Sequence, residues 1–159
     1  MSENAGLIAE QEAFNELGMS LHRLLSDGDE RIEYLATVLS PVTYERMRAY
    51  NPSGRFESPG GRFNSVDYPY AVSKALRALR AASYRDGVGT WFSARLQVTA
   101  AGAATAEYNY DDEPEWDAPV DSIAYVTDQE KFPRDEDKQP DWLKRKLAEG
   151  GERIAARSK

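Results

Sequence analysis

Residues 90–110 constrain the fold most strongly, because two alternating segments flank a short turn sequence. The first segment, residues 90–98, alternates apolar and polar side chains with the period of two that is typical of a half-buried strand. We expect its buried face to carry Phe92, Ala94, Leu96 and Val98, and its opposite face to carry Trp91, Ser93, Arg95 and Gln97. A turn near Gly102 leads into a second segment at 104–110. The pattern predicts an antiparallel hairpin.

A second pair of segments, residues 31–40 and 42–50, is rich in strand-forming residues. The two segments meet at Ser40 and Pro41, which predicts adjacent antiparallel strands joined by a tight turn. A helix over residues 31–39 stays open as an alternative. Residues 51–65 contain Pro, Gly and Ser around a GRF triplet that occurs twice, which predicts a turn or a short irregular hairpin.

Apolar spacing predicts two helices in the first half of the chain. The first spans residues 7–25 and ends at the turn sequence 26–29, and its apolar stripe is Leu7, Phe14, Leu17, Leu21, Leu24 and Leu25. The second spans 68–85, with Asp67 as its cap and Pro69 in its first turn. Its expected buried stripe is Val72, Ala75, Leu76, Leu79 and Ala82, and its expected off-stripe cations are Lys74, Arg77, Arg80 and Arg85.

Prolines interrupt the chain after Tyr110, which predicts an extended loop with one short strand at 122–126. A final helix is expected to begin near residues 140–142, to bury Trp142, Leu143 and Leu147, and to weaken at Gly150 and Gly151. Residues 151–159 are expected to fray. Together these elements predict an α+β fold, with one domain over residues 1–150 and an antiparallel sheet packed by two or three helices.

The composition excludes several kinds of catalytic site. The chain has no cysteine and one histidine, His22, so thiolate chemistry is absent and we expect His22 to be structural or exposed. The glycines at 54–61 and 87–89 lack the context of a phosphate-binding loop and are interpreted as turns. We therefore expect a protein that is not an enzyme and needs no cofactor. No apolar run reaches the roughly 20 residues of a membrane span, and we expect a cytoplasmic protein.

Charge is distributed unevenly along the chain. Residues 107–141 hold thirteen Asp and Glu but three Lys and Arg, a local charge of −10 against −7 for the whole chain. Residues 42–86 are a basic stretch, at +4. Such acidity disfavours nucleic acid and anionic membranes as partners and favours a basic protein. Aromatic residues are interleaved with the acids, which indicates a binding surface; the alternative is that the rings are core and the acids maintain solubility.

The acids at 111–117 also suggest an alternative, since clustered carboxylates bind hard cations. They lack the spacing and the turn glycine of an EF-hand. Two alternatives to a toxin-binding function remain. One is a metal-dependent hydrolase that uses this loop, and the other is a regulatory scaffold protein in a larger assembly.

Two segments resemble the YezG-like immunity proteins of bacterial polymorphic toxin systems. They are GTWFSARLQVTAAGAATAEYNYDDEPEW (89–116) and FPRDEDKQPDWLKRKL (132–147), with a Trp at the start of one strand, a glycine turn, and an aromatic, Asn and Tyr-Asp at the end of the next. The resemblance implies a small antitoxin that binds and blocks a cognate toxin, often a nuclease. The chain departs from the family in its GRF-rich loop and its basic C-terminal helix.

Charge and resemblance together predict that an acidic and aromatic face occludes the basic surface of a toxin. The predicted partner-binding residues are Tyr108, Tyr110, Asp111, Asp112, Glu113, Glu115, Trp116 and Asp117. Trp116 and Tyr110 are the expected anchors. Residues 132–142 are interpreted as a connector that docks the last helix through Phe132 and Trp142. The oligomeric state is left open.

Overall fold

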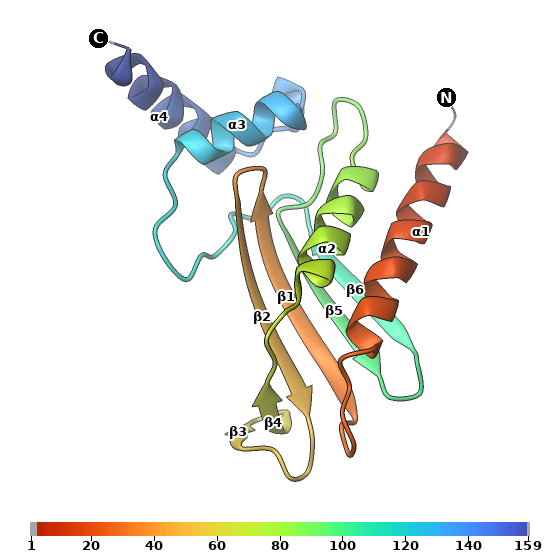
Figure 1. Ribbon diagram of the computed structural model, residues 1–159. Coiled ribbons are helices and arrows are strands. Elements are labelled where there is room, and N and C mark those ends of the chain that lie inside the picture. Colours follow the sequence, from red (N-terminus) through yellow and green to blue (C-terminus); the bar gives the residue numbers. More distant parts are fainter. Residues whose placement is uncertain (1–2, 159) are drawn as a thin grey trace. The chain divides into compact units, whose positions relative to one another are not determined.

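The computed structural model describes residues 3–158 and has an α+β fold with an antiparallel sheet, as predicted (Figure 1). Its strands lie in the order β3-β4-β2-β1-β5-β6. Along the chain the elements are α1 (Glu3–His22), β1 (Arg31–Leu39), β2 (Val42–Tyr50), β3 (Phe56–Ser58), β4 (Gly61–Ser65), α2 (Tyr70–Ala82), β5 (Ser93–Thr99), β6 (Ala104–Asn109), α3 (Ile123–Lys131), the 3-10 turn η1 (Glu136–Lys138) and α4 (Asp141–Arg157). No helix among the described residues is long and apolar enough to cross a membrane.

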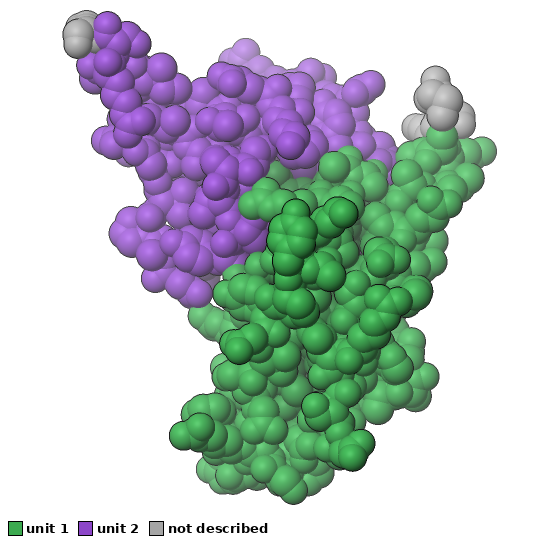
Figure 2. All heavy atoms as spheres, viewed as in Figure 1, with its two compact units in different colours: residues 1–35, 45–83, 94–107 green, residues 36–44, 84–93, 108–159 purple. Residues whose placement is uncertain are grey.

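The chain divides into two compact units, which Figure 2 shows in different colours. Unit 1 comprises residues 1–35, 45–83 and 94–107, and unit 2 comprises residues 36–44, 84–93 and 108–159. The strands β1 and β2 each contribute residues to both units. The prediction of a single domain over residues 1–150 stays a prediction.

In unit 1, α1 and α2 pack on each other and cover one face of the strands (Figure 1). The buried side chains are Leu17 and Leu21 from α1, Val72, Leu76 and Leu79 from α2, and Ile32, Tyr34, Met47, Ala49, Leu96 and Val98 from the strands. Leu17 and Leu21 of the predicted stripe are therefore buried as expected, whereas Leu24 and Leu25 lie beyond α1, which ends at His22, and are half-buried. Leu7, however, is 56% exposed, so the buried part of α1 does not extend to its first turns.

The helix α2 is shorter than predicted, and Asp67 does not cap it. Pro69 occupies the N-cap position and forms no side-chain hydrogen bond there. Val72, Ala75, Leu76 and Leu79 are buried as expected. Arg80, predicted to lie off the stripe, is 2% exposed. It follows Leu76 by one helical turn, so the buried face includes it even though it carries a charge.

Both predicted hairpins of unit 1 are present. In the β5–β6 hairpin, Gly102 adopts φ 96° and Thr99 N–H donates to the Ala103 carbonyl at 2.9 Å. In the β3–β4 hairpin, Phe56 pairs with Phe63. Residues 31–39 form a strand, so their helical alternative is wrong.

Unit 2 contains α3 and α4, which pack around the buried residues Leu39, Phe92, Tyr125 and Leu143. The short strand predicted at 122–126 is wrong, because residues 123–131 form α3. Strand-forming Ile123, Val126 and Thr127 favoured the strand locally. The helix instead places Tyr125 and Asp128, three residues apart, on one buried face.

Gly150 was predicted to weaken the last helix, yet α4 continues to Arg157. A Cβ atom at Gly150 would lie 2.5 Å from the Ser122 carbonyl oxygen and 2.7 Å from Val126 Cγ2. The glycine therefore allows α4 to cross close to α3, which is a packing function and not a helix end.

Candidate functional site

The predicted partner-binding residues all lie in unit 2: Tyr108 is in β6, and the others are on the loop that follows it. We call residues 111–117 the acidic loop. Its carboxylate side chains are exposed, namely those of Asp111, Asp112, Glu113, Glu115 and Asp117. The aromatic members, Tyr108, Tyr110 and Trp116, are half-buried. The sequence allowed either a binding surface or core rings with solubilising acids. The structure has features of both, since the acids are exposed to solvent while the rings pack partly against other residues.

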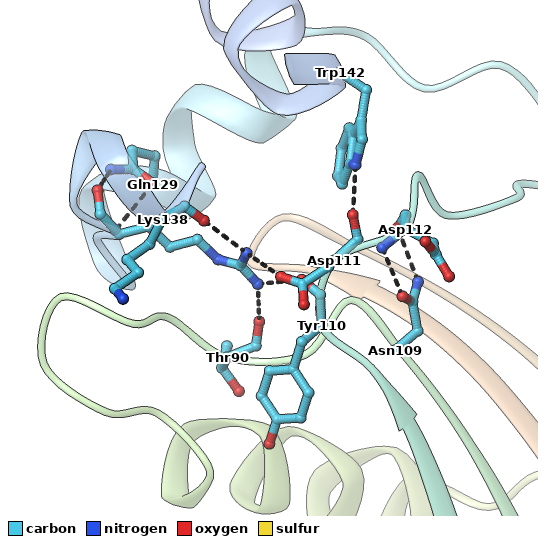
Figure 3. A network of polar contacts seen from close by, with 9 residues as sticks. Thr90, Asn109, Tyr110, Asp111, Asp112, Gln129, Lys138 and Trp142 are labelled. Carbon is cyan, nitrogen blue, oxygen red and sulfur yellow. Dashed lines mark hydrogen bonds and ion pairs between the residues drawn. The ribbon is translucent and has the colours of Figure 1, made fainter. Parts of the chain in front are cut away.

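Asn109, at the end of β6, fixes the first turn of the acidic loop. Its Oδ1 accepts from Asp112 N–H at 2.9 Å, and its Nδ2 donates to the Asp112 carbonyl at 2.9 Å (Figure 3). The same Nδ2 also donates to Ser93 Oγ at 3.1 Å. An amide side chain offers both a donor and an acceptor, which this turn requires. The beginning of the loop is therefore tied to β5.

Arg134, which the sequence placed in a connector, is a buried cation at the base of the loop. Its guanidinium donates to the carbonyl oxygens of Thr90, at 3.1 Å, and Tyr110 (Figure 3). It also pairs with Asp111 at 3.3 Å and lies 4.9 Å from the centre of the Phe92 ring. A buried charge is tolerated only when hydrogen bonds replace its water, and these carbonyls supply them. Arg134 thereby fixes the end of β6 and the first acid of the loop.

Gly89 makes room for this cation, and Gly87 makes room for the side chain of the next residue, Asp135. Both adopt positive φ, 94° and 74°, and a Cβ atom at Gly89 would collide with the Arg134 side chain. The Gly87 carbonyl accepts from Asp135 N–H at 2.7 Å, so the two chain segments lie in direct contact. The prediction of a turn at residues 87–90 is confirmed. That this turn accommodates the Arg134 side chain could not be predicted from the sequence.

Two tryptophans connect the acidic loop to the core of unit 2. Trp142 Nε1 donates to the Asp111 carbonyl at 2.7 Å (Figure 3). The centre of its ring lies 5.1 Å from that of Phe92. Trp116 Nε1 donates to the Tyr125 hydroxyl at 3.0 Å, and its ring lies 5.4 Å from that of Tyr44. The predicted anchor Trp116 is thus already engaged within its own unit. The predicted docking through Trp142 is confirmed, and Phe132 packs on Tyr84 at 5.7 Å.

Two acids of the region are structural. Asp128 is 6% exposed, and its Oδ1 accepts from the Ser40 N–H at 2.8 Å and the Ser40 hydroxyl at 2.9 Å, which holds the turn between β1 and β2. Asp121 accepts two hydrogen bonds from Arg153, both at 2.9 Å. The hydrogen bond from Arg153 holds the pKa of Asp121 below its usual value. These two acids are therefore engaged within unit 2, whereas the five carboxylates of the acidic loop are exposed.

Neither a metal site nor a catalytic histidine is evident in the part of the chain that the structure describes. Within residues 3–158, no three acidic, histidine or cysteine side chains are arranged to hold a metal ion. His22 is exposed on unit 1, and its Nε2 donates to the Ala100 carbonyl at 3.1 Å. This bond joins the end of α1 to the turn between β5 and β6.

Comparison with known proteins assigns no family to this chain. No protein-family model matches the chain, and no curated protein is similar enough in sequence to match it.

Proposed function

We propose that this chain is a non-enzymatic immunity protein, an antitoxin that binds a cognate toxin domain and blocks it. The toxin is of the nuclease type, the setting is the bacterial cytoplasm, and the acidic loop occupies the toxin's basic surface. The observation that carries the proposal is the set of five exposed carboxylates on a loop whose start is held by Asn109, Arg134 and Trp142.

Electrostatics supports this function. A nuclease binds phosphates through Lys and Arg, so a row of carboxylates is complementary to its cleft. Asp111 pairs with Arg134, and the side chains of Asp112, Glu113, Glu115 and Asp117 are exposed to solvent. Such exposed charges accelerate the encounter with a cationic partner by long-range attraction.

The rigidity of the loop supports it too. Ordering a flexible segment on binding reduces the affinity, and a loop that is already held avoids much of this cost. Here side-chain bonds fix the backbone of residues 109–112. Trp116 and Tyr110 are half-buried, so they offer a ring edge to a partner, and the carboxylates form the main contact surface.

The direct test is co-expression with the product of a neighbouring toxin-like gene. We expect the two proteins to copurify, and we expect this chain to restore growth to cells that express the toxin. A wild-type chain that neither copurifies nor restores growth would refute the proposal.

A charge-reversal variant locates the interface. The double variant Asp112→Lys/Glu113→Lys should no longer bind the toxin. The control Glu149→Lys/Glu152→Lys makes an equal change of charge at exposed positions of α4 and should still bind it. Equal loss in both variants would show that net charge matters and that the acidic loop does not.

A further inference from the structure

The strands of unit 1 have a second face, opposite to α1 and α2. Side chains alternate between the faces of a strand. In β1, Ile32 and Tyr34 are buried on the helical side, so Arg31, Glu33 and Leu35 lie on the other side, where they are half-buried. The same alternation places Arg46, Arg48 and Tyr50 of β2, and Arg95 of β5, on this second face.

A hollow of about 170 Å³ opens on this face. Its lining includes Glu33, Leu35, Arg46, Arg48, Tyr50 and Arg95. Because β1 lies between β2 and β5, the aliphatic Leu35 is flanked by arginines from both neighbouring strands. Strands two positions apart are separated by about 10 Å, which leaves room for one small anionic group between the guanidinium groups.

Arg48, which lines the hollow, and Arg31, which lies on the same face, are each positioned by an aromatic ring. The guanidinium of Arg48 lies 4.2 Å from the centre of the Phe63 ring, and that of Arg31 lies 3.9 Å from the centre of the Tyr50 ring. Arg31 also pairs with Glu33 at 2.9 Å. A stacked guanidinium keeps its N–H groups available at its edge, and those groups match the two oxygens of a carboxylate.

Two of these cations lack an acidic partner. Among residues 3–158, the side chains of Arg48 and Arg95 form no hydrogen bond and no ion pair with another residue. The other cations of the region differ, since Arg31 and Arg62 have carboxylate partners in Glu33 and Glu57. Arg48 and Arg95 therefore retain their full set of donors for a ligand.

We infer that this hollow binds carboxylates of an acidic polypeptide segment of a partner protein. Charge complementarity identifies the occupant, since arginines on both flanks of an aliphatic floor fit a carboxylate and its methylene groups. Nucleic acid fits less well. Its bases stack on exposed rings, whereas Tyr50 and Phe63 are 5% and 9% exposed beneath the arginines.

This inference does not rest on the proposed antitoxin function. The hollow is formed by unit 1, and the acidic loop belongs to unit 2. A chain that fails to bind a toxin can still bind an acidic segment here, and the converse also holds. The two proposals therefore fail independently.

Titration of the full chain with a blocked peptide of alternating Glu and Ser tests the inference, with the matching Gln and Ser peptide as its control. The backbone amide resonances of β1, β2 and β5 should shift when the acidic peptide is added and should not shift when the control peptide is added. Arg48→Gln/Arg95→Gln should weaken binding by about tenfold or more, because charge-assisted hydrogen bonds are lost. Lys144→Gln/Arg145→Gln removes the same charge from exposed positions of α4 and should leave the affinity within about twofold.

Arg95→Gln alone provides a second variant, because Arg95 is exposed and its replacement leaves the packing on Phe63 unchanged. This substitution should weaken the affinity for the acidic peptide by about threefold or more. The inference is overturned if the acidic peptide does not bind, if both double variants weaken it equally, or if a short oligodeoxythymidine binds at this face more tightly than the peptide.

Discussion

Arg134 and Asp111 form an ion pair of very unequal exposure: Nη1 and Oδ1 lie 3.3 Å apart, while the arginine side chain is 3% exposed and the aspartate side chain 81%. The aspartate is therefore well hydrated, and the pair alone contributes little stability. The main partners of Arg134 are the carbonyl oxygens of Thr90 and Tyr110. Its effect is to fix the base of the acidic loop and to leave the loop's other carboxylates directed at solvent.

Replacement of Arg134 by methionine should destabilise the protein by on the order of 3 kcal/mol, because two buried carbonyl groups lose a charged donor. Urea unfolding followed by circular dichroism measures this loss. Arg145→Met, at an exposed position of α4, is the control and should change stability by about 0.5 kcal/mol or less. Equal stability of the two variants would contradict the function assigned to Arg134.

Gly150 and Gly151 offer a matched pair of substitutions. Gly150→Ala should destabilise by about 1–3 kcal/mol, because the new Cβ atom collides with the Ser122 carbonyl and forces the helices apart. Gly151→Ala meets no atom within 4 Å and should stabilise by up to about 1 kcal/mol, because alanine favours a helix. Thermal unfolding of both variants checks the opposite signs, and the same sign in both would contradict the close crossing of α3 and α4.

Asp121 should titrate differently when its partner is removed. The hydrogen bond from Arg153 lowers the folded-state pKa of this carboxyl, so the bond contributes stability above the unfolded pKa, and that stability is lost as the pH falls through the folded pKa. Arg153→Gln should raise the Asp121 pKa toward its ordinary value. Carboxyl carbon NMR follows the titration, with Lys144→Gln as the control. An unchanged pKa would show that the pair does not persist in solution.

The hydrogen bond between Trp116 and Tyr125 is testable through the tyrosine. Burial raises the pKa of the Tyr125 hydroxyl, and the N–H of Trp116 opposes this rise by stabilising the phenolate. Trp116→Phe should therefore raise that pKa further and destabilise the fold by about 1 kcal/mol. Absorbance titration of the phenol detects the change. A lower pKa in the variant would contradict the contact and would leave Trp116 free to anchor a partner.

Periodicity made much of unit 1 predictable. The alternation at 90–98 correctly identified Ala94, Leu96 and Val98 as buried. A strand with one covered face has apolar residues at every second position, and this pattern is visible in the sequence. Trp91 was assigned to the open face but is fully buried, since it precedes β5 and packs on Tyr108 at 5.6 Å. A residue just outside an element need not follow its period.

Unit 2 was less predictable, because its structure depends on contacts between distant segments. Arg134 is a charged residue between prolines, and a charge normally indicates a solvated loop. Nothing near it in the sequence identifies the carbonyl groups of Thr90 and Tyr110 as its partners. Gly150 was misinterpreted for the same reason, since a glycine required for close packing and one that ends a helix look alike in a sequence.

The association rate with the cognate toxin domain, measured at several salt concentrations, tests the central claim most directly. For the wild-type chain we predict a rate that falls steeply as salt rises, because the acidic loop attracts a basic surface. Asp112→Lys/Glu113→Lys should slow association by about tenfold at low salt and flatten this dependence, whereas Glu149→Lys/Glu152→Lys should stay within about twofold of wild type. Wild-type kinetics in the acidic-loop variant would contradict the claim that this loop is the binding surface.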